Sequence, residues 1–182
     1  INSNYKMNRL LQGEVGSGKT VVSAISLYAV TTAGYQGAIM VPTEVLASQH
    51  FKTFSEYFKN TEIKVALLTS SINPKDKKLI LEQLSNGDID IVIGTHSLIQ
   101  KDVEFKKLGL VVTDEEHRFG VRQKEQLKSL RAEVDILNLT ATPIPRTLNM
   151  SMAGLRDLSI IATPPAKRLS IKTFVRDHDK AL

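Results

Sequence analysis

The chain has 182 residues, the size of one domain with a substantial buried core. Its 42% hydrophobic and 24% charged residues are ordinary for a globular protein, and no apolar run approaches the roughly 20 residues of a membrane span. Cysteine is absent, which excludes disulfides and Cys-ligated metals, and the first residues lack the apolar stretch of a signal peptide. We therefore expect a cytoplasmic protein with no membrane partner.

A short apolar strand at Leu10 and Leu11 begins the chain, and a helix over Val21–Val30 follows it after a glycine-rich loop. The loop fits the pattern Gly, four residues, Gly, Lys, then Ser or Thr, in which consecutive backbone N–H groups converge on phosphates. It predicts a nucleotide-binding site rather than a structural turn. Lys19 adds a charge at the β- and γ-phosphates, and the Thr20 hydroxyl suits Mg²⁺. The phosphate-binding candidates are Gly13, Glu14, Val15, Gly16, Ser17, Gly18, Lys19 and Thr20.

Short apolar strands then alternate with helical patterns along the rest of the chain. We expect strands at 38–41, 64–68, 90–94, 108–113, 134–139 and 158–161, and helices at 43–58, 75–84, 121–130 and 146–153. Thr43 is the expected N-cap of the second helix, and Asn86-Gly87 ends the third. This alternation indicates βαβ units. It predicts an α/β fold with a mostly parallel central sheet covered on both faces.

An acidic group follows the strand at 108–113: Asp114-Glu115-Glu116-His117. In an open parallel sheet, the carboxyl ends of the strands line the ligand crevice, where the glycine-rich loop also lies. Asp114 is therefore a candidate to hold Mg²⁺, and Glu115 to orient or deprotonate the attacking water. The pair predicts hydrolysis rather than transfer to a hydroxyl group. The alternative is a helix N-terminus that is simply rich in acids.

Asp114 to His117 resembles the DExH box of superfamily 2 helicases and translocases, and other motifs match in the same order. Residues 13–20 resemble motif I, 42–47 motif Ia, 94–96 motif Ib and 140–142 motif III. The resemblance implies a three-layer RecA-like P-loop NTPase domain that uses ATP and Mg²⁺, with Glu115, Asp114 and Lys19 in the catalytic site. It further implies nucleic-acid contacts at Pro42, Thr43, Gly94, Thr95 and His96, and coupling of nucleotide state to strand binding by His117, Thr140 and Thr142.

Within that superfamily the chain resembles two kinds of double-stranded DNA translocase. Residues 7–13, 34–38 and 94–100 look more like the RecG branch-migration helicases, whereas residues 114–122, 142–150 and 156–165 are closer to the transcription-repair coupling factor Mfd. The mixture fits either a divergent member or two joined sequences. The implied partners are duplex or branched DNA, contacted through its backbone, and RNA polymerase through modules outside this chain.

The resemblance implies a motor domain over residues 1–165 and a linker over 166–182 that leads to a second RecA-like domain. That second domain would supply an arginine finger, so we expect weak nucleotide binding and slow turnover from this chain alone. Two alternatives stay open: the ATPase domain of an RNA helicase, and a non-motor ATPase switch that binds protein.

Three further groups are ambiguous at this level. The net charge of +5 fits a solvated surface as well as a nucleic-acid footprint. Arg118, Arg122 and Lys124 fit a basic surface near DNA and a solvated helix face equally. His50 and His96 are widely separated and match no carboxylate pattern, so no metal site is expected from them.

Overall fold

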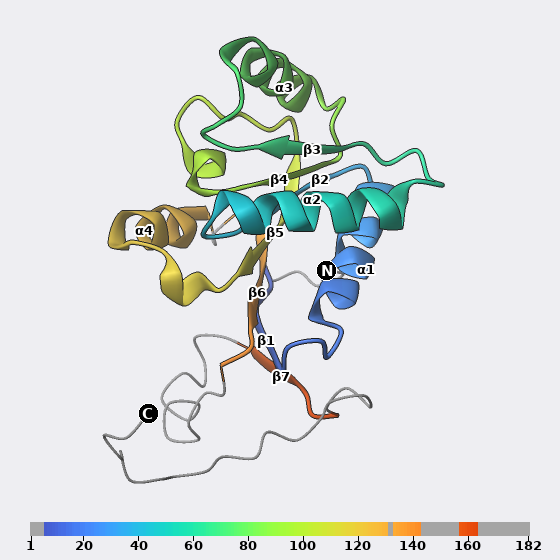
Figure 1. Ribbon diagram of the computed structural model, residues 1–182, viewed down its shortest axis with the longest axis vertical. Helices are drawn as coiled ribbons and strands as arrows, with labels where there is room; N and C mark the ends of the chain where they lie inside the picture. The colour runs from blue at the N-terminus through green and yellow to red at the C-terminus, as the bar shows by residue number, and fades with distance from the viewer. Residues whose placement is uncertain (1–5, 131–132, 143–156, 164–182) are drawn as a thin grey trace, which may run out of the picture.

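The computed structural model describes residues 6–130, 133–142 and 157–163. In this part of the chain, seven parallel strands form one sheet in the order β3-β4-β2-β5-β6-β1-β7 (Figure 1). The strands are β1 (Asn8–Gly13), β2 (Gln36–Met40), β3 (Val65–Leu68), β4 (Ile91–Gly94), β5 (Leu108–Asp114), β6 (Asp135–Thr140) and β7 (Asp157–Ile161). The helices are α1 (Lys19–Thr32), α2 (Glu44–Phe58), α3 (Pro74–Asn86) and α4 (Val121–Leu130), with short 3₁₀ turns η1 (His96–Ile99) and η2 (Glu116–Arg118).

The helices begin and end at the signals that the sequence carries. The Thr43 side chain accepts a hydrogen bond from the backbone N–H of Leu46 at the start of α2. Asn73 does the same for Asp76 at the start of α3, where Pro74 is the first helical residue. Gly87 ends α3 at a φ of 81°, a left-handed conformation that glycine adopts without steric cost.

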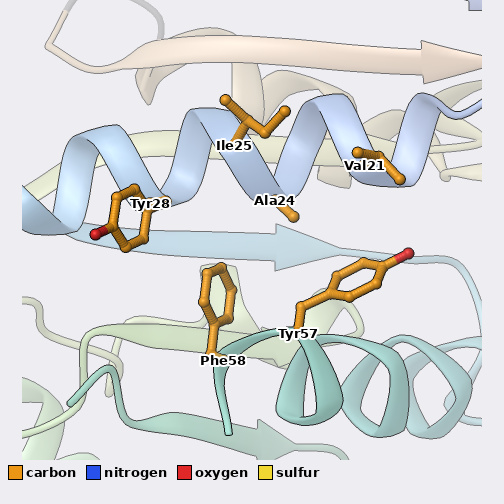
Figure 2. A pocket seen from close by; sticks show the side chains of 6 residues that line it. All are labelled: Val21, Ala24, Ile25, Tyr28, Tyr57 and Phe58. Carbon is orange, nitrogen blue, oxygen red and sulfur yellow. The ribbon is translucent and has the colours of Figure 1, made fainter. Parts of the chain in front are cut away.

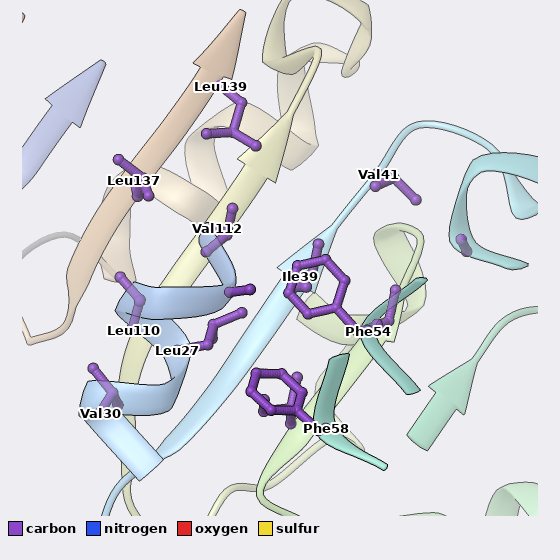
Figure 3. Close-up of a cluster of buried hydrophobic side chains, with 14 of the residues drawn as sticks. Leu27, Val30, Ile39, Val41, Phe54, Phe58, Leu110, Val112, Leu137 and Leu139 are labelled. Carbon is purple, nitrogen blue, oxygen red and sulfur yellow. The ribbon is translucent and has the colours of Figure 1, made fainter. Parts of the chain in front are cut away.

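Apolar side chains alternate between the two faces of the sheet and build a core on each. On β2, Ile39 packs with α1 and α2 on one face, whereas Ala38 and Met40 pack with α3 and α4 on the other. The α1 and α2 face contains Phe54, fully buried, and the rows of leucine and valine from β5 and β6 (Figure 3). Burial on both faces explains why the strands read as continuous apolar runs.

The structure confirms the predicted α/β class and the parallel sheet with helices on both faces. β2 begins two residues earlier than predicted, at Gln36, whose buried amide donates to the carbonyl oxygens of Leu84 and Ile89 and accepts from the N–H of Lys107. The sequence pattern alone cannot show that Gln36 is a buried strand residue with hydrogen-bonded partners rather than a polar residue of the preceding turn. The predicted helix at 146–153 and the linker at 166–182 lie outside the described residues.

A buried polar chain crosses the centre of the sheet. The Thr113 hydroxyl donates to the Asn138 side-chain oxygen at 2.7 Å, and the Asn138 amide nitrogen lies 3.4 Å from the Asn8 side-chain oxygen. Thr113 and Asn138 are 0% and 1% exposed, so both depend on protein partners for their hydrogen bonds. This series of hydrogen bonds joins β5, β6 and β1, the three strands that carry the candidate site. Among the described residues, no helix is long and apolar enough to span a bilayer.

Candidate nucleotide-binding site

The glycine-rich loop joins β1 to α1 in the conformation that phosphate binding requires. Gly16 and Gly18 have φ angles of 79° and 96°, which a residue with a Cβ adopts only at a steric cost. Gly18 is the N-cap of α1 and provides no side-chain cap, and the first turn of α1 contains no acidic residue. The first backbone N–H groups of α1 and the positive end of its dipole therefore suit an anion.

The inside of the loop also fits phosphate oxygens. The Ser17 Oγ is buried and makes no hydrogen bond to any described residue. A Cβ at Gly13 would lie 2.5 Å from that oxygen, so a larger residue there would displace the Ser17 side chain. A buried hydroxyl without a partner costs free energy unless a ligand satisfies it. Together with the Thr20 hydroxyl, this donor set is suitable for a nucleotide phosphate and its Mg²⁺.

Lys19 lies over the loop rather than in solvent. Its Nζ donates to the carbonyl oxygens of Gly13 at 2.7 Å and Glu14 at 2.8 Å. An ammonium has three donors, so one remains available for a phosphate oxygen while these two bonds hold the charge in place. The backbone of the loop thus positions the lysine that the sequence predicts to contact phosphate.

Asp114 ends β5 at the same edge of the sheet as the loop. In the register of the sheet, Leu139 of β6 pairs with Asp114 on one side and with Leu11 of β1 on the other. Two strand spacings therefore separate Asp114 from the strand that feeds the loop, a distance of about 10 Å. An Mg²⁺ ion that contacts phosphate and a carboxylate through water fits such a separation.

Glu115 has an unusual backbone. Its φ of 56° makes it the one residue other than glycine with positive φ in the described part of the chain. This conformation costs about 1–3 kcal/mol and persists only where the surroundings fix it, which occurs often at functional sites. The Glu115 N–H donates to the Leu139 carbonyl at 3.3 Å, and its carboxylate lies 3.8 Å from the Arg118 Nε.

The model of the DEAD/DEAH box helicase family matches residues 2–151, most of the chain. The chain belongs to the DEAD/DEAH box helicase family. It is 54% identical over 179 residues to the ATP-dependent DNA helicase RecG of Bacillus subtilis strain 168, covering 98% of this chain and 26% of the relative. It is 57% identical over 173 residues to the transcription-repair-coupling factor of Haemophilus influenzae, covering 95% of this chain and 15% of the relative.

Solved structures agree with this assignment. A structure of RecG bound to a three-way DNA junction matches with a TM-score of 0.78 and 46% identity over 91% of this chain and 22% of that one. The predicted resemblance to both groups is confirmed, and each relative aligns with nearly the whole chain rather than with one half. The chain spans about a quarter or less of the length of these relatives.

The segments that resemble motif Ia and motif Ib follow two neighbouring strands, β2 and β4, and β2 in turn lies next to β5. The Val41 N–H donates to the Gly94 carbonyl at 3.0 Å, which joins the two loops. Thr43 and His96 are exposed and Pro42 is partly exposed, whereas Gly94 and Thr95 are buried. A nucleic-acid contact from Gly94 or Thr95 would therefore depend on the backbone, and one from Thr43 or His96 could use the side chain.

Gly94 has a structural requirement of its own, and we expect Gly94→Ala to lower the free energy of unfolding by about 1–3 kcal/mol. A Cβ at this position would lie 2.1 Å from the backbone carbonyl oxygen of Leu68, so β3 and β4 would have to move apart. Urea unfolding of the chain measures the loss. Gly120→Ala is the control, because its Cβ would come no closer than 3.9 Å to the Gln123 side chain. An unchanged Gly94→Ala midpoint would show that β3 accommodates the methyl group.

The segment that resembles motif III begins at Thr140, the last residue of β6. The Thr140 hydroxyl accepts a hydrogen bond from the Thr142 N–H at 3.1 Å, which holds a tight turn beyond the strand. Thr140 is buried and Thr142 exposed. The main chain of His117 lies in η2, beside Glu115. A coupling role for His117, Thr140 and Thr142 stays a prediction, because no contact among the described residues tests it.

His50 is the neighbour of the site that the sequence did not identify. Its Nε2 lies 3.1 Å from the Asp114 Oδ2, although 64 residues separate the two. Among the described residues, no group of three or more His, Cys, Asp or Glu side chains is arranged to hold a metal ion. The available signal was helical spacing, because His50 shares a buried face with Ala47 and Phe54, where a polar side chain needs a partner.

An apolar hollow of about 270 Å³ lies between α1 and the end of α2 (Figure 2). Its walls are Val21, Ala24, Ile25, Tyr28, Tyr57 and Phe58. Two of these residues, Tyr28 and Phe58, stack their rings with 6.5 Å between the ring centres. Carbon-rich walls do not suit a phosphate, so this hollow is distinct from the nucleotide site at the glycine-rich loop.

Proposed function

We propose that the chain is the first motor domain of an ATP-dependent double-stranded DNA translocase or helicase of DNA repair and recombination. One observation carries the proposal: the glycine-rich loop after β1 and the Asp114-Glu115 pair after β5 lie at one edge of the sheet, separated by a single strand. Family membership and relatives named as a DNA helicase and a transcription-repair-coupling factor support the DNA assignment.

In the proposed mechanism the loop binds the ATP phosphates through its backbone N–H groups, and Lys19 places its charge against the β- and γ-phosphates. Mg²⁺ would be held by Thr20 and Asp114 and would neutralise phosphate charge. Glu115 orients the attacking water and accepts its proton. The hydrogen bonds of Lys19 to Gly13 and Glu14 support this assignment, since they fix the ammonium at the loop before phosphate is contacted.

The proposed DNA contacts lie on the edge formed by Pro42, Thr43 and the loop after β4. The exposed Thr43 hydroxyl and the N-terminus of α2 suit phosphates of a nucleic-acid backbone, and such contacts position a protein without reading sequence. Glu44, in the first turn of α2, has its carboxylate held by Ser71. The Ser71 N–H donates to this carboxylate at 3.1 Å, and the hydrogen bond from the Ser71 side chain lowers the pKa of Glu44. A second RecA-like domain, and RNA polymerase through other modules, are proposed partners of the complete protein.

The experiment that tests the function measures ATP hydrolysis by the complete protein with duplex DNA, branched DNA or single-stranded RNA. We expect DNA to stimulate turnover. Lys19→Ala should weaken nucleotide binding by about ten- to a hundredfold and remove that stimulation, because it deletes a charged hydrogen bond to phosphate. Lys75→Ala, an exposed lysine on α3, is the control.

Each alternative has its own result in this experiment. Stimulation by single-stranded RNA but not by duplex DNA would favour an RNA helicase. A rate of ATP hydrolysis that none of the three nucleic acids changes would favour a non-motor ATPase switch. The same stimulation in Lys19→Ala as in the unchanged protein would contradict the assigned role of the loop.

A further inference from the structure

His50 makes a specific contact with the candidate magnesium ligand. Its Nε2 lies 3.1 Å from the Asp114 Oδ2, and the two side chains are 12% and 20% exposed. A carboxylate only accepts hydrogen bonds, so the histidine donates from Nε2. At this level of burial, the hydrogen bond is shielded from competing water and restricts the carboxylate to one orientation.

The imidazole itself is fixed by its helix. The ring packs against Phe54, one turn further along α2, with 6.1 Å between ring centres and a tilt of 41°. Phe54 is fully buried in the core between α2 and the sheet. His50 therefore has little freedom to leave Asp114 unless α2 moves, and the position of the helix is transmitted to the carboxylate.

The same helix carries the proposed DNA-contacting segment. Thr43, its N-cap, lies seven residues before His50, which is about 10 Å along a helix. Thus α2 bears the motif Ia loop at one end and a hydrogen-bond donor to Asp114 two turns later.

We propose that His50 is a positioning residue for magnesium: it holds the Asp114 carboxylate in the orientation that receives the ion and links that orientation to α2. The proposal rests on the proposed function, in which Asp114 is a magnesium ligand. Groups that hydrogen-bond to metal ligands orient them, and their loss lowers metal affinity by about ten- to a hundredfold.

The test compares His50→Gln with His50→Asn in the complete protein. The Gln amide nitrogen reaches the position of Nε2, whereas the Asn amide reaches only that of Nδ1. Binding of a fluorescent ADP is measured without Mg²⁺ and then across a Mg²⁺ titration, with Mn²⁺ binding by electron paramagnetic resonance as a second measurement. We expect His50→Asn to need about tenfold more Mg²⁺ than the unchanged protein to reach half of the Mg²⁺-dependent change in ADP binding. The Mg²⁺ concentration that His50→Gln needs should stay within about threefold of that of the unchanged protein.

Nucleotide affinity without Mg²⁺ should be unchanged in both variants, which also shows that they fold. Gln49→Ala, an exposed neighbour on α2, is the control for the helix surface. Equal Mg²⁺ dependence of the Asn and Gln variants would overturn the proposal, as would a change in Mg²⁺-free affinity alone. Asp114→Asn distinguishes failure of the proposed function from failure of this inference. If Asp114→Asn kept the normal Mg²⁺ dependence, the magnesium role of Asp114 itself would be overturned. If Asp114→Asn lost that dependence while both His50 variants kept it, only the role of His50 would be overturned.

Discussion

Glu115→Gln should bind ATP as tightly as the unchanged protein and hydrolyse it about 10²- to 10⁴-fold more slowly, the usual contribution of a general base. The exchange keeps the size of the side chain and its ability to hydrogen-bond. It removes the capacity to accept a proton from water, together with the negative charge that lies 3.8 Å from the exposed Arg118 guanidinium. Because the backbone at φ 56° is equally strained with either residue, the variant should retain its stability. Single-turnover hydrolysis and equilibrium binding of a fluorescent ATP analogue measure the two effects separately.

Glu125→Gln is the matched control, since the same exchange removes one charge from an exposed position on α4 that is not among the candidate site residues. It should leave binding and turnover unchanged. If Glu115→Gln hydrolysed ATP at the normal rate in the complete protein, another group would have to activate the water. If it lost ATP binding as well, the carboxylate would be supporting the loop rather than the chemistry.

The sequence predicted those parts of the fold that depend on local patterns. Alternation of apolar strands with capped helices was enough for the parallel sheet, because Thr43 and Gly87 perform locally the roles that their residue types favour. The glycine-rich loop and Asp114 could be placed at one edge because the carboxyl ends of parallel strands always meet there. The strand register then showed which residues lie side by side: Leu139 of β6 pairs with Leu11 of β1 and with Asp114 of β5.

Contacts between residues distant in sequence could not be predicted in this way. His50 and Asp114, or Thr113 and Asn138, become neighbours only when helix and sheet pack, and no spacing rule relates their positions. Gly94 shows a second limit of prediction from sequence, because two different requirements select the same residue there. Its place in motif Ib suggests a nucleic-acid contact, but the approach of the Leu68 carbonyl already requires glycine there. Motif membership alone does not separate a binding role from a packing role.

The largest effect that we expect concerns a second domain. The chain alone should hydrolyse ATP at least about 10³-fold more slowly than the complete protein, because an arginine finger stabilises charge that develops on the transferred phosphoryl group. The relatives are about four times as long as the segment that they share with this chain, or longer, which leaves room for such a domain. Steady-state turnover of the 182-residue chain and of the complete protein, both with saturating DNA, measures the ratio.

The described chain provides a physical reason for this dependence. Lys19 supplies one charge from the loop. The charge of Arg118 lies against Glu115, the candidate base. Adding the second domain as a separate polypeptide should restore part of the activity, and replacing its finger arginine by alanine should abolish that restoration. Turnover by the chain alone that matched the complete protein would show that the charge comes from within these residues, with Arg118 the first to examine by an Arg118→Ala exchange.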